Sequence, residues 1–358
     1  MKILYIGHYR DGTGWGDAAL NNILALHKAG VDVVPRAISY NDAGYDIGQT
    51  VSDLEKKSTE GCDVCIQHTL PGNYFYNSNF KNIGFIETEC SDFSDTGWHK
   101  NINTMDELWA PCEYSKSASE KSGVNIPIKI APHCIDMDQY YNTSNGPKIQ
   151  EMTSGFTFAF VGEFIERKNL KALLRAFHTE FHPKEPANLF IKTSGQDVSN
   201  IEAYCSSVKN GLKIRSEYKK EIILSGKLDK KDYLSVLSQA SCFVSPSRGE
   251  GFCIPALESM ALGLPCIYTE GMAMDEFCIG ESVNSFEQPC FGAMDSLPNL
   301  YSSNSTWLEI DVTDLQIKMR NMFLSGVSQD LKDKCKTRAR EYSHESIGKT
   351  LKELLNDE

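Results

Sequence analysis

Two glutamates in the second half of the chain carry the clearest chemistry: Glu250 and Glu258, with seven residues between them. Glu250 stands in a predicted turn, where its carboxylate could accept hydrogen bonds from sugar hydroxyls. Glu258 stands on a predicted helix, about one turn from its start, where it could reach the diol of a ribose. The start of that helix presents free N–H groups and positive potential, which suit a phosphate. The alternative interpretation is that both glutamates are solvated charges beside a turn.

The segment 241–267 predicts the elements that position these two side chains. Cys242–Val244 is a short apolar run, typical of a buried strand. Pro255 suits the first position of a helix, because its ring pre-sets φ and it has no N–H to leave unpaired. We expect the helix to cover 256–262 and to stop at Gly263, before the next apolar run. Strand, loop, helix and strand form the unit of a parallel sheet whose ligand end is the loop.

This segment closely resembles the donor site of the retaining glycosyltransferases of family 4, whose pattern is P-S-x-x-E-G-F-x-x-x-x-L-E-A-M-A-x-G-x-P. Ser259 replaces the usual alanine, and the resemblance is strong over 156–270 but diffuse over 1–140. The positions that agree are Pro246, Ser247, Glu250, Gly251, Phe252, Leu257, Glu258, Met260, Ala261, Gly263 and Pro265.

The resemblance implies transfer of a sugar from a nucleoside diphosphate sugar to an acceptor hydroxyl, with retention of the anomeric configuration. It assigns Glu250 to the sugar, close to the anomeric carbon, and Glu258 to the ribose. The family is usually drawn with front-face displacement, in which the leaving phosphate oxygen takes the acceptor proton, and no metal or other cofactor is expected. Further donor contacts are expected from Gly251, Phe252, Cys253 and Leu228, and from Gly14 and Gly16 in a glycine-rich loop after the first strand.

The loop after Gly162 departs from the family pattern. Family members usually carry an Arg directly after this glycine and a Lys five residues later, and these cations clamp the donor pyrophosphate. Lys168 matches the Lys, but Glu163 stands where the Arg is expected. We therefore expect either that Arg167 supplies the guanidinium or that Glu163 points away. A cation beside the leaving diphosphate is required in a metal-free site, although a solvated basic turn is the alternative.

Polar residues at predicted strand ends in the first half indicate where the acceptor would lie. His68 follows the apolar run 63–67, and a catalytic and a structural role for it stay equally open. Glu87 and Glu89 end the next run, at a place where similar enzymes meet the acceptor; they could equally bind cations or water. His133 lies in a Pro-His-Cys-Ile-Asp turn that is similar to the family's P-N-G-V-D, and we assign it to the acceptor side.

Composition narrows the class of protein. The chain has 358 residues, a formal net charge of −12 and a pI near 5.2, which disfavours a nucleic acid as the main partner. A local basic pocket, or peripheral contact with anionic lipid, stays open. Twelve cysteines show no disulfide framework, and Cys62 and Cys65 form a lone C-x-x-C pair inside a strand-like run. These features, with no apolar run long enough to cross a membrane, predict a cytoplasmic location.

Strands alternate with helices in both halves, which predicts an α/β protein of GT-B architecture, with two Rossmann-like domains facing across a cleft. We expect an acceptor-side domain over 1–140, a linker over 141–153 and a nucleotide-sugar domain over 154–335. A final helix over 336–358 would pack back towards the first domain.

The predicted function is a nucleotide-sugar-dependent, retaining glycosyltransferase whose acceptor is a glycan, a lipid-linked sugar or another hydroxyl compound. Three alternatives are kept: a sugar-nucleotide epimerase of the same fold, a catalytically silent sugar-nucleotide-binding module, and a dehydrogenase. The dehydrogenase rests only on the first glycine-rich loop, since no acidic residue is clearly placed after Val31–Val34 to bind a dinucleotide ribose.

Overall fold

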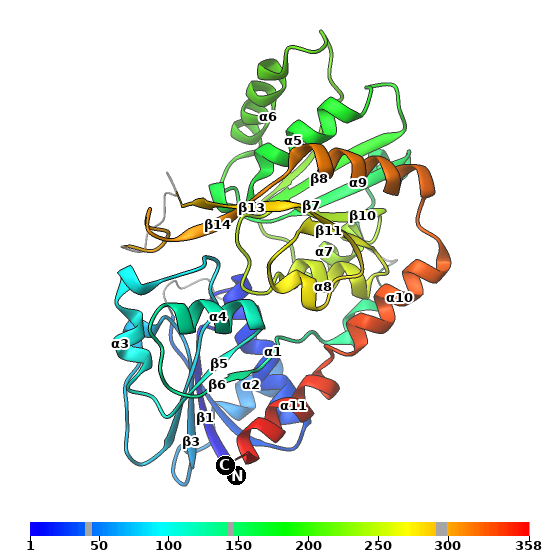
Figure 1. The fold of residues 1–358 in the computed structure, drawn as a ribbon. Coiled ribbons are helices and arrows are strands. Elements are labelled where there is room, and N and C mark those ends of the chain that lie inside the picture. Colours follow the sequence, from blue (N-terminus) through cyan, green and yellow to red (C-terminus); the bar gives the residue numbers. More distant parts are fainter. Residues whose placement is uncertain (40–44, 142, 144–145, 291–298, 358) are drawn as a thin grey trace.

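The computed structural model describes residues 1–39, 45–141, 143, 146–290 and 299–357. The described residues form two α/β units, one above the other in Figure 1, each built on a six-stranded parallel sheet. The strand order is β2-β1-β3-β4-β5-β6 in the first sheet and β12-β11-β10-β7-β8-β9 in the second. The predicted α/β architecture with two Rossmann-like units is confirmed.

The first unit alternates strands and helices from the start of the chain. Its second strand extends three residues beyond the predicted 31–34. The elements are β1 (Lys2–Gly7), α1 (Gly14–Lys28), β2 (Asp32–Ala37), α2 (Gly48–Leu54), β3 (Val64–His68), β4 (Lys81–Phe85), α3 (Trp98–Ile102), β5 (Glu107–Ala110), α4 (Glu113–Lys121) and β6 (Ile128–Ile130).

The second unit follows two short 3₁₀ turns, Met137–Tyr140 and Gln150–Thr153, which lie in and beside the segment expected to be an irregular linker. Its elements up to the last sheet strand are β7 (Phe156–Val161), α5 (Leu170–Glu180), β8 (Ala187–Thr193), α6 (Val198–Leu212), β9 (Ile222–Ser225), α7 (Lys230–Leu237), β10 (Cys242–Ser245), α8 (Ile254–Ala261), β11 (Cys266–Thr269) and β12 (Gly280–Val283). The chain then continues through β13 (Ser285–Pro289), β14 (Thr306–Ile310), α9 (Val312–Ser325), α10 (Gln329–Arg340) and α11 (His344–Asn356).

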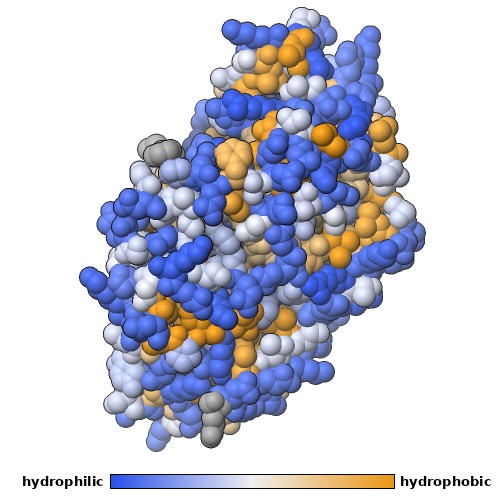
Figure 2. Space-filling view, viewed as in Figure 1, coloured by the Kyte–Doolittle hydropathy of each residue, from blue (hydrophilic) through white to orange (hydrophobic). Residues whose placement is uncertain are grey.

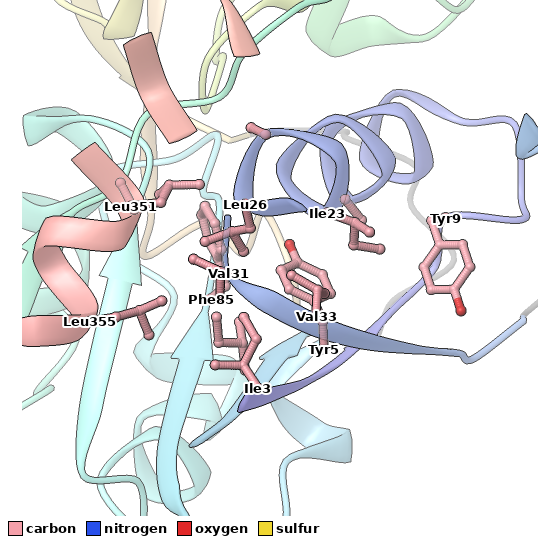
Figure 3. Close-up of a cluster of buried hydrophobic side chains, with 14 of the residues drawn as sticks. Ile3, Tyr5, Tyr9, Ile23, Leu26, Val31, Val33, Phe85, Leu351 and Leu355 are labelled. Atoms are coloured by element: carbon pink, nitrogen blue, oxygen red, sulfur yellow. The ribbon is translucent and has the colours of Figure 1, made fainter. Parts of the chain in front are cut away.

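Buried apolar strands explain why the sheets form. Parallel strands covered on both faces read as continuous apolar runs, and β1 and β10 do so along almost their whole length. In Figure 3, Ile3 and Tyr5 of β1 and Val33 of β2 lie with Ile23 and Leu26 of α1 in one cluster. The sheets therefore bring the carboxyl ends of their strands, where the loops carry polar residues, to the boundary between the units.

The last helix, α11, belongs to the core of the first unit. The buried side chains of Ile347, Leu351 and Leu355 join the same apolar cluster as Leu26, and Figure 3 shows Leu351 and Leu355 pointing into it. A Cβ on Gly348 would come within 2.3 Å of the carbonyl oxygen of Ala25, so α11 and α1 approach one another closely. The preceding helix, α10, packs instead on α8 of the second unit.

The segment expected to be a loop-rich insert, 282–304, forms part of a hairpin. Residues 291–298 lie outside the described residues, but β13 on one side of them pairs antiparallel with β14 on the other. Figure 1 shows this hairpin at the edge of the second unit, directly over α4. The prediction failed here because Ser285–Pro289 has no clear alternation of apolar and polar residues.

Most of the visible surface in Figure 2 is hydrophilic, with apolar side chains gathered in small groups. Within the described ranges, no helix is both long and apolar enough to span a membrane.

Candidate active site

The loop between β10 and α8 is buried at the boundary between the two units. Its last residue, Cys253, has a φ of 76°, a left-handed conformation that is uncommon for a residue with a side chain. α8 begins at Ile254, so Pro255 is its second residue and not its first, and it ends at Ala261, one residue before the predicted end. No side chain caps the start of α8. An uncapped start leaves N–H groups that can bind an anion.

Glu250 is buried in this loop beside two cations. The Nζ atom of Lys168 lies 2.6 Å from its Oε1 atom, and the Nη1 atom of Arg167 lies 3.5 Å from Oε2. Burial alone would raise the pKa of the Glu250 carboxyl, but these two charges outweigh it, and the pKa lies below its usual value. Glu250, Lys168 and Arg167, which were selected from the sequence, are therefore brought together in one group.

Arg167 also connects the two units. Its Nη1–H donates to the carbonyl oxygen of Gly249 at 2.7 Å, and its Nη2 atom lies 3.1 Å from Oε1 of Glu89 in the first unit. Burial opposes the charge of Arg167, but the negative charge of Glu89 and other neighbours raises the pKa of the guanidinium. Its buried Nε–H has no hydrogen-bond partner among the described residues. The Nε–H of this guanidinium thus remains without a protein acceptor in the described part of the chain.

Glu163, the departure from the family pattern, lies on the surface. Its side chain is exposed, and it forms no ion pair with another described residue. Arg167 lies half-buried beside Glu250, and the negative charge of Glu163 is among those that raise the pKa of its guanidinium.

Two glycines allow the loop to touch the first unit. A Cβ on Gly249 would come within 1.7 Å of the carbonyl oxygen of Glu89, and one on Gly251 within 3.0 Å of the Cβ of Glu87. The Sγ–H of Cys112 donates to the carbonyl oxygen of Gly251 at 3.1 Å across the same boundary. Side chains at these glycines would push the units apart, so the spacing Gly-x-Gly in this loop has a packing reason.

The sequence analysis missed Arg248, whose side chain ties the loop to neighbouring segments of the second unit. Its Nε–H donates to Oε2 of Glu309 on β14 at 2.6 Å, and its Nη1–H donates to Oε1 of Glu166 at 2.6 Å. Its guanidinium carbon also lies 5.3 Å from the centre of the Trp307 ring. Its place two residues before Glu250 was the only signal in the sequence, because its partners come from distant elements.

Glu258 lies in a separate network. Its Oε1 atom forms an ion pair with Lys230 and accepts a hydrogen bond from the Tyr140 hydroxyl at 3.2 Å. Its Oε2 atom accepts from the Tyr233 hydroxyl at 2.8 Å. Lys230 also lies 3.8 Å from Asp17 of the first unit. The sequence analysis missed Lys230, Tyr233, Tyr140 and Asp17, since nothing in their spacing relates them to Glu258.

His68 and Glu87, selected at two predicted strand ends, and His133, selected in a predicted turn, meet in a third group. The Nε2 atoms of His68 and His133 lie 3.1 and 2.8 Å from Oε1 of Glu87. The Tyr5 hydroxyl lies 2.8 Å from Nδ1 of His68. Burial alone would raise the pKa of Glu87, but the two histidines lower it well below its usual value. This group touches the central loop through the edge of the His133 ring on Phe252, with ring centres 5.2 Å apart.

The same three side chains could hold a metal ion. One ligand atom from each lies within 4.8 Å of the other two, and two imidazoles with one carboxylate form a set that binds zinc and similar ions. Among the described residues, this is the group of His, Cys, Asp and Glu side chains whose possible ligand atoms lie close enough together to share one ion. The sequence analysis left cation binding open for Glu87 but did not relate it to the two histidines, because the residues stand at 68, 87 and 133.

The glycine-rich loop of the first unit lies near the Glu258 network. Gly14 begins α1 and Gly16 is in its first turn, where the N–H of Gly16 donates to the Thr13 hydroxyl that caps the helix. This N–H is therefore not free for a phosphate. Asp17, which follows it, faces Lys230. The contact of this segment with the second unit is thus made by the Asp17 carboxylate.

Leu228 is half-buried, between β9 and α7. Close to it in the chain, an open cavity of about 470 Å³ lies at the carboxyl ends of β8 and β9, lined by Gly195, Gln196, Asp197, Val198, Ser225 and Gly226. Ligands of open α/β sheets bind outside the carboxyl ends of the strands. The lining of this cavity shares no residue with the Glu250 group.

Sequence comparison points to sugar transfer for part of the chain. Residues 155–286 match the family model described as Glycosyl transferases group 1. A protein of Sulfolobus islandicus filamentous virus, with the provisional name glycosyltransferase 48, is 30% identical over 73 residues. That match covers 19% of this chain and spans only 24% of the length of the viral protein.

Structural similarity covers both units. Sucrose-phosphate synthase from Thermosynechococcus elongatus has a TM-score of 0.66 at 14% identity, covering 99% of this chain and 98% of that one. HepE from Anabaena, solved with UDP and glucose, has a TM-score of 0.61 at 11% identity, covering 99% of both chains. The chain has the GT-B fold, and its residues 155–286 match the glycosyl transferases of group 1.

Proposed function

We propose that this protein is a retaining glycosyltransferase that moves a sugar from a nucleoside diphosphate sugar to an acceptor hydroxyl. The observation that carries this proposal is the group formed by the buried Glu250 and the half-buried Lys168 and Arg167. It lies beside the uncapped start of α8, at the boundary between two Rossmann-like units. The group falls inside the segment that matches the glycosyl transferases of group 1.

Lys168 and Arg167 would stabilise the leaving diphosphate. Both are half-buried, and both have Glu250 as a counter-ion. The unpartnered Nε–H of Arg167 and the N–H groups at the start of α8 supply donors to phosphate oxygens. Fixed donors aimed at developing negative charge contribute most in a buried, water-poor site. No metal is needed for this role.

Glu250 would bind the transferred sugar, and Glu258 the ribose. The bond between the anomeric carbon and the diphosphate oxygen breaks while the acceptor oxygen bonds to the same face of that carbon. The leaving phosphate oxygen takes the acceptor proton, so no separate base is required. Glu89, Glu87, His68 and His133 lie in the first unit beside the loop, and we assign the acceptor to their side.

The donor nucleotide is suggested by a structural relative. HepE was solved with UDP, with UDP and glucose, and with UDP-glucose. UDP-sugars are therefore the first donors to test, followed by GDP- and ADP-sugars. For the acceptor we propose a glycan or a lipid-linked sugar.

Calorimetric titration with UDP, GDP and ADP tests donor binding, and mass spectrometry of sugar nucleotides incubated with acceptors tests turnover. We expect Lys168→Ala to abolish measurable nucleotide binding, while Lys171→Ala, an exposed lysine on α5, leaves it unchanged. Release of diphosphate that depends on an acceptor supports a transferase. An epimerised donor, or binding without any turnover, would instead support one of the two alternatives of the same fold.

A further inference from the structure

A second cavity lies between the two units, beside the hairpin of β13 and β14. It has a volume of about 160 Å³, well above the roughly 10–15 Å³ that one water molecule requires. The first unit lines it with Ser91 and with Tyr114, Ser117 and Lys121 of α4, and the hairpin contributes Glu287 and Trp307 among others. Both units thus build this cavity.

Hydrogen bonds between Ser91 and Thr306 hold its two walls together. The N–H of Ser91 donates to the carbonyl oxygen of Thr306 at 2.8 Å, and the N–H of Thr306 donates to the Ser91 hydroxyl at 3.1 Å. The two hydroxyls lie 2.7 Å apart. Three contacts between the same two residues give the cavity a defined shape.

Trp307 has a donor that no described residue satisfies. It lines the cavity and is 2% exposed, yet its buried Nε1–H has no hydrogen-bond partner in the described part of the chain. Native proteins rarely leave a buried donor unpaired, because the group has lost its water without replacement. Because this nitrogen is itself shielded from solvent, its signal would report on what packs against the ring and not on a direct hydrogen bond to an occupant.

The chemistry of the lining fits a neutral polyhydroxyl compound. The hydroxyls of Ser91, Ser117 and Tyr114 can donate and accept, and aromatic rings with polar edges pack well on the apolar faces of a ring-shaped ligand. Lys121 and Glu287 carry opposite charges, so neither an anion nor a cation is favoured. A saccharide has these properties.

The position of the cavity relates it to the candidate active site. Ser91 is two residues from Glu89, which forms the ion pair with Arg167 beside Glu250. Through Ser91, the wall that the first unit contributes to the cavity continues into the segment that carries Glu89, where the acceptor is expected. We propose that it is a subsite for a second sugar unit of the acceptor, next to the unit that receives the transferred sugar. This assignment rests on the proposed function and narrows the acceptor to an oligosaccharide or a glycan.

The subsite can be tested with disaccharides and no nucleotide. The chain has four tryptophans, so ¹⁵N-indole labelling gives a simple spectrum in which Trp307→Phe identifies the Trp307 signal. We expect at least one of maltose, cellobiose, lactose, mannobiose and diacetylchitobiose, at millimolar concentrations, to shift the Trp307 Nε1–H signal saturably. Ser117→Phe should raise the apparent Kd about tenfold or more by filling the cavity.

Glu120→Phe is the matched control, because Glu120 is exposed on α4 and does not line the cavity. It should leave the Kd unchanged. The proposal would be overturned if no disaccharide moved the Trp307 signal, or if the shift were the same in Ser117→Phe and the parent. Either result would mean that the cavity holds only water. Because the samples contain no nucleotide, Lys168→Ala should respond like the parent, and failure of donor binding stays distinguishable from failure of the subsite.

Discussion

Glu250 and Glu258 come from one loop and one helix, and both are buried, but their partners differ in kind. Glu250 faces Lys168 and Arg167, and Glu89 completes the group, so two cations balance two carboxylates. Glu258 faces one cation, Lys230, which is also near Asp17. The hydroxyls of Tyr140 and Tyr233 donate the remaining hydrogen bonds to Glu258.

This difference indicates which end of a nucleotide sugar each group would bind. Lys and Arg keep their charge at neutral pH and can exchange a carboxylate for a phosphate without any proton transfer. A carboxylate that already accepts from hydroxyl groups can accept equally well from the hydroxyls of a ribose. We therefore assign the Glu250 group to the reacting end of the donor and the Glu258 group to binding, and mutations can separate the two roles.

The largest effect is expected at Arg167. If Arg167 has taken the role of the family arginine, Arg167→Ala should lower kcat and kcat/KM together, since the charge of the leaving group is greatest in the transition state. Loss of one donor to a developing anion typically costs about 100- to 1000-fold. Steady-state kinetics with the identified donor measure this.

Glu163→Ala is the control for that loop, because Glu163 is exposed. We expect the variant to keep its activity or to bind the donor more tightly. An inactive Glu163→Ala with a fully active Arg167→Ala would reverse the assignment and leave Lys168 as the sole cation for the diphosphate.

A smaller effect, on binding and not on chemistry, is expected at Glu258. Removing charge-assisted hydrogen bonds to a diol costs about 1.5–3 kcal/mol, so Glu258→Ala should raise the Kd for the nucleoside diphosphate roughly tenfold or more. Calorimetric titration checks this value, and kcat at saturating donor should change much less. An unchanged Kd would remove Glu258 from the donor site.

Stability should also depend on pH in opposite directions through Glu250 and through Asp17, which lies beside Lys230 in the Glu258 network. The pKa of Glu250 is lowered, so its contribution to stability is present above the pKa of the unfolded chain and is lost as the pH falls through the folded pKa. Burial raises the pKa of Asp17, and Lys230 offsets this only in part. The contribution of Asp17 to the free energy of unfolding is therefore present at low pH and is lost as the pH rises through its folded pKa.

Denaturant unfolding between about pH 2 and 7 tests this contrast, with the change at Glu250 expected below about pH 4.5 and that at Asp17 above about pH 4, at about 1.4 kcal/mol for each unit of pKa shift. Relative to the parent, Asp17→Asn should gain stability as the pH rises, whereas Glu250→Gln should lose it. The same direction in both variants would contradict the contrast.

The smallest effect is expected on chelation. Because Lys168 and Arg167 can neutralise the diphosphate, excess EDTA should leave turnover unchanged. If EDTA abolished turnover and Mg²⁺ or Mn²⁺ restored it, the cationic account would be wrong. His68, Glu87 and His133 would then be the residues to mutate first.

The sequence allowed prediction of the site where its residues lie close together in the chain. Glu250 and Lys168 could be selected because each falls in a contiguous pattern, and the fold follows from strands and helices that alternate in both halves. His68, Glu87 and His133 could be selected singly, since each ends a strand or stands in a turn. Their convergence depends on the strand order, which the sequence does not state.

Residues that act through distant partners were missed. Lys230 and Tyr140 reach Glu258 from elements 28 and 118 positions away, and Arg248 depends on Glu309 of the hairpin. Side-chain packing between separate elements decides these contacts, and local propensity and periodicity do not record it. The Thr13 cap on the N–H of Gly16 was missed for a different reason: the glycine pattern predicts backbone freedom but not which N–H groups are already used.

The docking of α11 on α1 also affects the order in which the protein can be made. A chain emerging from the ribosome exposes its first residues first, and N-terminal domains generally fold as they appear. Here Ile347, Leu351 and Leu355 complete the apolar cluster around α1. The first sheet can therefore form early, but one flank of α1 stays exposed to water until residues 344–356 have been synthesised, after the whole second unit. We expect a nascent chain stalled before residue 344 to depend on chaperones that cover this apolar surface.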